Sequence, residues 1–150
     1  MDNGASYSAA DPEFDARVRH SFSRQGLMAT LGARIASLAP GACEIRAPYR
    51  SELSQQDGYF HAGVTGAIAD SACGYAAFSL MPSSAAVLTV EYKLNLVAPA
   101  RGSELVARAQ VIRSGRTLTT CRAEVHCIAD GKELLCAAML STIITLTARE

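Results

Sequence analysis

The chain has 150 residues, 14 basic and 14 acidic side chains, and apolar side chains at 49% of its positions. That length fits one domain with a substantial core, here residues 1–150. A net charge of zero argues against a nucleic-acid partner. Because neither a membrane span nor a signal peptide is evident, we expect a cytoplasmic protein without a membrane partner.

The cysteines are odd in number, and none forms a CxxC pair or a Cys/His cluster with zinc-like spacing (Cys43, Cys73, Cys121, Cys127 and Cys136). We interpret them as reduced, mostly buried thiols and expect no metal site. Cys73 has no evident histidine partner, so packing is a better interpretation of it than nucleophilic chemistry.

Residues 1–10 are typical of a flexible leader, and an N-terminal helical segment is predicted over 11–26. Asp11 suits the N-cap, Pro12 suits the first helical position, and Gly26 can close the helix. Apolar residues recur at four-residue spacing along one face of this segment (Phe14, Val18 and Phe22).

Two strands are predicted next, at about 31–39 and 42–50, joined by a turn at Pro40-Gly41. A polar loop over 51–60 follows. Residues 62–79 are apolar almost all the way round, which is the pattern of a fully buried helix. Two helical glycines, Gly66 and Gly74, are expected to be compensated by close approach of another backbone.

The last 60 or so residues predict an antiparallel meander. From Leu88 to Val97 the apolar and polar residues alternate, which places Thr89 on the polar face of a strand. Further strands at about 105–111, 121–127 and 133–147 are separated by turns at Ser114-Gly115 and Asp130-Gly131. One buried helix with five or six such strands indicates an α+β fold, an antiparallel sheet wrapped around a long central helix.

Between Gly58 and Val90 the only formally charged side chain is Asp70. A carboxylate within an apolar segment is costly unless something uses or satisfies it. Asp70 is therefore the best single indicator of function. The alternative is a structural carboxylate satisfied by backbone groups or by an arginine.

The run His61-Ala62-Gly63, with Asp70 nine residues after the histidine and Gly74-Tyr75-Ala76 beyond it, resembles the signature of hotdog-fold thioesterases. The branch it is most similar to is the PaaI-like, phenylacetate-pathway type of acyl-CoA thioesterase. The segment Thr89–Ala100 is similar to that family's strand after the helix. One departure is Ala62, which stands where the family's His-Gly-Gly has its first glycine.

The resemblance implies a reaction in which an acyl-CoA is hydrolysed to a free acid and coenzyme A, with no cofactor. Asp70 matches the family's carboxylate, which acts as general base or as nucleophile. The backbone N–H of Ala62, with Gly63 beside it, matches the donor that polarises the thioester carbonyl. A helix N-terminus is suited to that task because its first N–H groups lack intrahelical partners.

Three further positions are implied by the resemblance. Gln55 would orient water or the thioester, although Gln56 beside it offers the same chemistry. His61 would support the loop or the carbonyl region, or act only as a capping residue. Thr89 matches a position where the family has Ser or Thr, and is otherwise a simple strand-forming residue.

If the helix starts at His61, Asp70 lies about 14 Å further along its axis and on the opposite side. The two ends could not meet on one carbonyl within a protomer. We therefore predict a dimer with two shared active sites around a two-fold axis. The resemblance favours a tetramer, a dimer of dimers.

Two alternatives use the same scaffold. A hydratase or dehydratase of acyl thioesters would change the enoyl absorbance without releasing thiol, but the motif does not resemble that of dehydratase relatives. A non-catalytic acyl-CoA-binding or regulatory module would bind the ligand saturably without releasing thiol.

Overall fold

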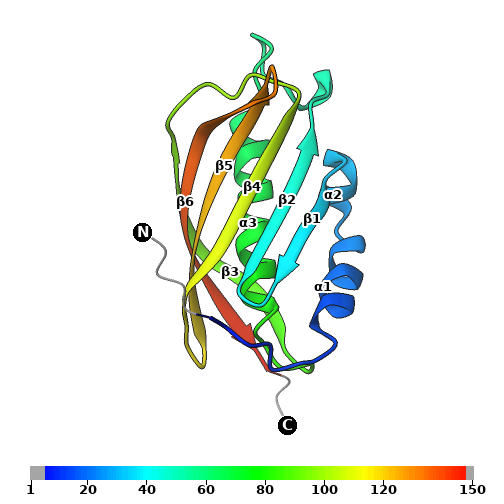
Figure 1. Cartoon of the computed structure of the whole chain (residues 1–150), viewed down its shortest axis with the longest axis vertical. Coiled ribbons are helices and arrows are strands. Elements are labelled where there is room, and N and C mark those ends of the chain that lie inside the picture. The colour runs from blue at the N-terminus through cyan, green and yellow to red at the C-terminus, as the bar shows by residue number, and fades with distance from the viewer. Residues whose placement is uncertain (1–5, 148–150) are drawn as a thin grey trace.

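The computed structural model describes residues 6–147 and has an antiparallel sheet packed on one long helix (Figure 1). This confirms the α+β architecture. Part of the expected leader, residues 1–5, lies outside the described residues. The helices are α1 (Phe14–Ser23), α2 (Gly26–Leu31) and α3 (Ala62–Phe78), with a short 3-10 turn η1 (Ser51–Leu53). The strands are β1 (Arg34–Ala39), β2 (Ala42–Pro48), β3 (Ala86–Leu96), β4 (Glu104–Ser114), β5 (Leu118–Ala129) and β6 (Lys132–Leu146).

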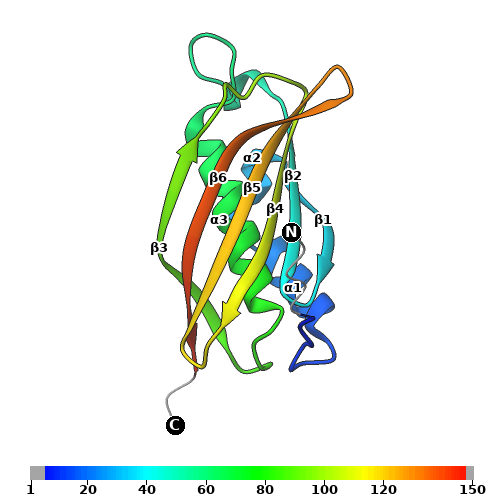
Figure 2. The ribbon, with the colours of Figure 1, turned by 60° about the vertical axis from the view of Figure 1, so that its left-hand side comes forward.

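The six strands pair in the order β1-β2-β4-β5-β6-β3, and every pair is antiparallel. Strand β3 follows α3 in the chain but joins the sheet beyond β6, so it becomes an edge strand. Figure 2 shows β3 running along one flank of α3, while the rest of the sheet curves around the helix. Within residues 6–147 no helix is long and apolar enough to cross a lipid bilayer.

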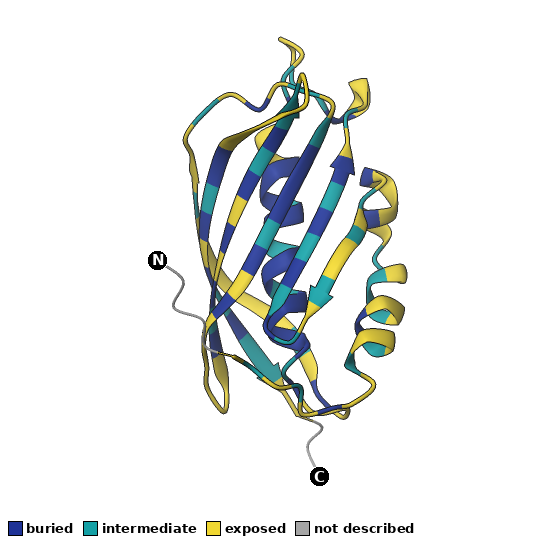
Figure 3. Ribbon diagram, viewed as in Figure 1, coloured by how far each residue is buried: buried dark blue, intermediate teal, exposed yellow. Residues whose placement is uncertain are grey.

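Helix α3 is buried over most of its length, as its apolar composition predicts (Figure 3). Its alanines Ala69, Ala72 and Ala76 are fully buried, and their small side chains let the sheet approach closely. The sheet contributes larger side chains to the same core, including the fully buried Ile45 and Leu105. This packing fixes the position of both ends of α3.

The N-terminal helical segment is divided in two, and the predicted strand start at residue 31 is wrong. Gln25 is extended, with ψ 105°, so Gly26 begins α2 and does not close α1. Helix α2 ends at Gly32, whose φ of +64° is a left-handed conformation that favours glycine. Met28 and Leu31 are both buried, and this three-residue spacing is helical.

Helix α1 begins later than predicted, because Glu13 and not Asp11 is its N-cap residue. Asp11 lies two residues before the N-cap, and its carboxylate accepts a hydrogen bond of 2.9 Å from the Glu13 N–H. It also pairs with Arg17 at 2.8 Å. The guanidinium of Arg17 donates to the carbonyl oxygens at the end of α3 and beyond it (Phe78, Met81 and Pro82).

The expected compensation at the α3 glycines is also wrong within this chain. A Cβ at Gly66 would contact side chains, Leu94 at 3.5 Å and Tyr92 at 3.8 Å, and no backbone. A Cβ at Gly74 would find nothing within 4 Å among the described residues. The space beside Gly74 is therefore open.

Because Arg17 joins α1 to the C-terminal end of α3, we expect Arg17→Met to lower the free energy of unfolding by about 2–3 kcal/mol. The variant leaves Asp11 and several carbonyl groups without their charged partner. Denaturant unfolding measures the loss. The matched control is Arg19→Met, which removes an exposed pair with Asp15 and should cost less than about 1 kcal/mol. Equal losses in the two variants would contradict this role.

Candidate active site

The N-terminus of α3 leaves one backbone N–H group available. His61 is the N-cap residue, and its Nδ1 accepts a hydrogen bond of 2.8 Å from the Gly63 N–H. The carbonyl of His61 accepts from Val64 at 2.9 Å. Within residues 6–147 the N–H of Ala62 has no partner. Among these three donors, Ala62 alone can bind a developing oxyanion without breaking a bond.

Two sequence expectations are refined here. The His61 ring caps the helix, which is the capping role that the sequence left open beside support of the loop or the carbonyl region. Gly63 leaves room for that ring, because a Cβ at Gly63 would lie 3.0 Å from the His61 Nδ1, a tight contact that the ring could relieve only by shifting. The N–H of Gly63 is already used, so it is not a second free donor.

Backbone hydrogen bonds hold the loop before α3. The N–H of Gln55 donates to the Tyr59 carbonyl at 2.9 Å, and the N–H of Phe60 donates to the Ala100 carbonyl at 2.9 Å. The Gln55 side chain accepts from the N–H of Asp57. Gln56 is exposed, and its amide donates a hydrogen bond to the Asp57 carboxylate. Of the two glutamines, Gln55 is therefore the better candidate for the role that the sequence left open between them.

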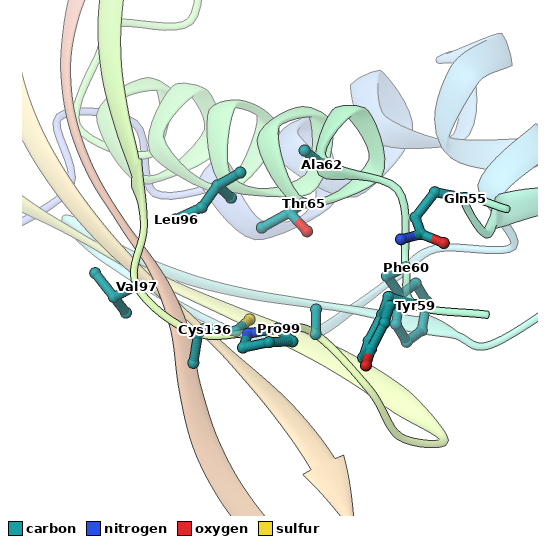
Figure 4. Close-up of a pocket in the computed structure, with 11 residues that line it drawn as sticks. Gln55, Tyr59, Phe60, Ala62, Thr65, Leu96, Val97, Pro99 and Cys136 are labelled. Atoms are coloured by element: carbon teal, nitrogen blue, oxygen red, sulfur yellow. The ribbon is translucent and has the colours of Figure 1, made fainter. Parts of the chain in front are cut away.

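Gln55 and Ala62 line one pocket of about 530 Å³. Figure 4 shows them along one side of it, with Tyr59 and Phe60 beneath and Leu96 and Val97 across from them. Most of the remaining lining is apolar. Such a pocket suits a flexible organic chain better than a charged group.

Asp70 lies eight residues further along α3, in a second pocket of about 280 Å³. Its Oδ1 accepts a hydrogen bond of 2.7 Å from the Thr89 hydroxyl. Within residues 6–147, its Oδ2 has no hydrogen-bond partner and no ion pair involves this carboxylate. Burial raises the pKa of Asp70 above its usual range, and the Thr89 hydrogen bond partly opposes that rise.

A β-bulge brings Thr89 to this carboxylate. The register of β3 with β6 shifts between Thr89 and Glu91, so Val90 is the extra residue. Thr89 pairs with the buried Ile143 and therefore faces α3, whereas strict alternation would have grouped it with Glu91 on the outer face. Bulges commonly re-aim a side chain next to an active site.

The predicted site residues thus form two groups. Gln55, Ala62 and the capping His61 lie at the start of α3, and Asp70 with Thr89 lies near its middle. About 12 Å of helix separates Ala62 from Asp70, and Ala62 lines the first of the two pockets described above while Asp70 lines the second.

Sequence reasoning did not identify three polar residues that line the Asp70 pocket, namely Gln25, Ser71 and Tyr75. Ser71 adjoins Asp70 in the chain, but nothing in the sequence connects Gln25 with it. The five cysteines are free and buried, as expected. The pKa of Cys73 is raised by its contact with the Cys121 thiol and by burial, which supports a packing role.

Comparison with known proteins assigns the family. The model of the thioesterase superfamily matches residues 57–134, a range that includes Ala62, Asp70 and Thr89. The chain belongs to the thioesterase superfamily.

Solved structures and a sequence relative agree with this assignment. The structure of a thioesterase family protein from Silicibacter pomeroyi is 50% identical, with a TM-score of 0.89, over 90% of this chain and 99% of that one. The PaaI protein of the E. coli phenylacetic acid degradation operon is 17% identical, with a TM-score of 0.79, over 89% and 94%; this likeness shows the shared fold. A Halobacterium salinarum protein provisionally designated an esterase is 32% identical over 110 residues, 70% of this chain and 72% of that protein.

The Thr89 hydrogen bond to Asp70 can be tested by titration. Thr89→Val removes the hydroxyl that stabilises the carboxylate, so we expect the pKa of Asp70 to rise further. Carbon-13 NMR of the side-chain carboxyl measures it. The control is Thr142→Val, which removes a hydroxyl from the outer face of β6 and should leave the pKa of Asp70 unchanged. An unchanged titration in Thr89→Val would contradict the hydrogen bond.

Proposed function

We propose that this protein hydrolyses acyl-CoA thioesters to a free acid and coenzyme A. The observation that carries the proposal is Asp70, a half-buried carboxylate on the central helix, with one oxygen unpartnered and facing a pocket. Membership of the thioesterase superfamily supports the choice of a thioester as substrate.

The chemistry needs a base and an oxyanion donor. Asp70 takes a proton from water as the hydroxyl oxygen bonds to the carbonyl carbon. The carbonyl oxygen gains negative charge, which the N–H of Ala62 stabilises. The C–S bond then breaks, and the sulfur leaves with the proton from Asp70. Direct attack by Asp70 to give a mixed anhydride, later hydrolysed by water, uses the same groups.

These groups meet only if two copies of the chain combine. Along β3, the Asp70 pocket contacts residues 87–89, and the pocket at the start of α3 contacts residues 96–97. Antiparallel pairing of two β3 edges around Tyr92 brings the first region of one copy against the second region of its partner. The Asp70 pocket of each copy then faces the Ala62 pocket of the other, giving two shared sites.

Strand β3 has the properties of such an interface. It is eleven residues long and pairs only with β6 among the described strands. Apolar side chains along it are about half exposed (Leu88 59%, Val90 55%, Tyr92 50% and Leu96 56%). A long, apolar and unpaired edge is rarely left open in a native protein.

Charge also supports this pairing. In a two-fold arrangement centred on Tyr92, Glu91 of each copy lies opposite Lys93 of the other. Opposite charges directly across an antiparallel pair are favourable, whereas most other registers place like or uncharged residues together. A dimer built this way can form the dimer of dimers that the resemblance favours.

Within the superfamily we place the chain near the PaaI-like branch. The supporting residues are His61, Asp70 and the segment from Thr89 onward, and the fold shared with E. coli PaaI is consistent with that placement.

Asp70→Asn tests the role of the carboxylate directly. The amide is nearly isosteric but cannot accept the proton, so we expect thiol release from acyl-CoA to fall by roughly 10²–10⁴-fold. A coloured thiol reagent measures the rate across short, medium, long and aromatic acyl groups. Sedimentation should show an unchanged oligomer. Near-full activity of the variant would remove Asp70 from the mechanism, and saturable binding without thiol release by the wild type would favour a binding module.

Ala62→Pro removes the proposed oxyanion donor without disturbing the helix. Proline is favoured at the first helical position, and His61, with ψ 138°, already has the conformation that a following proline requires. We expect activity to fall by about 10²–10³-fold.

Mixing this variant with Asp70→Asn tests the shared site. After subunit exchange, half of the dimers are mixed and each holds one intact site, so we expect about one quarter of wild-type activity. As the control, each variant is taken by itself through the same subunit-exchange procedure and assayed. Activity no higher than that of the parents would show that both groups act within one protomer.

A further inference from the structure

The pocket beside Asp70 has one polar wall and one largely apolar wall. Strand β3 supplies Val87, Leu88 and Thr89 on one side. The opposite side comes from α3 and from the junction of α1 with α2, which contributes Gln25. A reacting acyl group held at Asp70 lies between these walls.

The polar wall is a hydrogen-bonded group centred on Tyr75. The amide nitrogen of Gln25 donates to the Tyr75 hydroxyl at 2.9 Å, and the hydroxyls of Ser21 and Tyr75 are 3.2 Å apart. The Ser71 hydroxyl donates to the Gln25 amide oxygen at 3.4 Å. Burial raises the pKa of Tyr75, so its phenol stays neutral.

This network fixes the Gln25 amide while leaving part of its capacity unused. The side-chain amide of Gln25 has two N–H groups, and one of them has no hydrogen-bond partner among the described residues. The amide oxygen can accept a second bond besides that from Ser71. The wall can therefore bind a polar group without losing a bond it already makes.

Gly74 lines this pocket on the α3 side. It lies four residues after Asp70, so both occupy the same face of α3, about 6 Å apart along the axis. A Cβ at Gly74 would meet nothing within 4 Å. Glycine destabilises a helix relative to alanine, and no neighbouring atom among the described residues requires a glycine here. Its missing side chain leaves space beyond the carboxylate for a ligand about as long as one turn of α3.

We propose that this pocket receives the acyl group, that Gly74 sets its length, and that Gln25 selects an acyl group ending in a hydroxyl or another hydrogen-bonding group about 6 Å from the thioester carbon. The assignment rests on the proposed thioesterase activity. An apolar acyl chain of the same length leaves the free N–H and the amide oxygen of Gln25 without a ligand partner. A longer acyl chain does not fit within the pocket.

Gly74→Ala tests the depth. A methyl group fills the open space without a clash, and alanine is the better helix former, so the melting temperature should rise. We expect kcat/KM for valeryl-CoA and its ω-hydroxy analogue to fall by tenfold or more, while the value for acetyl-CoA stays within about twofold. Gly26→Ala is the matched control: it also adds a methyl in open space on a helix, and it should leave the substrate profile unchanged.

Gln25→Leu tests the polar end. The wild type should prefer ω-hydroxyvaleryl-CoA over valeryl-CoA by about tenfold, the effect of one hydrogen bond, and the variant should lose that preference. Tyr75 keeps Ser21 as a partner in this variant. An unchanged profile in Gly74→Ala, or equal rates for the two wild-type substrates, would overturn the inference.

Binding of the same thioesters to Asp70→Asn, measured by calorimetry, gives a readout that needs no turnover. The hydroxyl preference should persist there and disappear when Gln25→Leu is added. If the wild type releases no thiol from any substrate, the proposed activity fails, while this binding preference still decides the pocket assignment. Equal affinities for the hydroxylated and plain thioesters would overturn it.

Discussion

Helix α3 is composed of small and apolar residues, so the sheet must cover it on nearly every side, yet it carries a carboxylate at Asp70 and an unpaired N–H at Ala62. These requirements conflict, because a fully enclosed helix would leave both polar groups without water or a ligand. The fold resolves the conflict by leaving α3 uncovered at its N-terminus and along the flank next to β3. Both candidate reactive groups lie in these two openings.

The position of β3 follows from the same constraint. The chain leaves α3 at its C-terminal end and returns beside β6, so β3 forms the edge of the sheet and one wall of the Asp70 pocket. The sheet of one copy ends there, with apolar side chains exposed. In the dimer that we propose, the pairing of two copies would both cover that edge and complete the site.

The N-terminal helices have a different part in this arrangement. Arg17 joins α1 to the carbonyl groups at the C-terminal end of α3, which holds the α1–α2 junction against that helix. Gln25, at this junction, is thereby fixed beside Tyr75 and Ser71. A segment without any recognisable motif thus supplies part of the pocket that adjoins the carboxylate.

The sequence by itself determined the buried helix and the antiparallel meander, and it singled out Asp70 as the candidate site residue, because periodicity, turn residues and a charge in an apolar run are local signals. It did not determine where the N-terminal helical segment ends, because Gly26 and Gly32 both fit a helix terminus and only packing of Met28 and Leu31 against the core distinguishes them. Likewise, only the tertiary structure decided that Thr89 faces Asp70, that His61 occupies the N–H of Gly63, and that Gln25 lies beside Ser71. Those contacts depend on a bulge and on chain segments far apart in the sequence, whose relative placement is fixed by burial of the whole core.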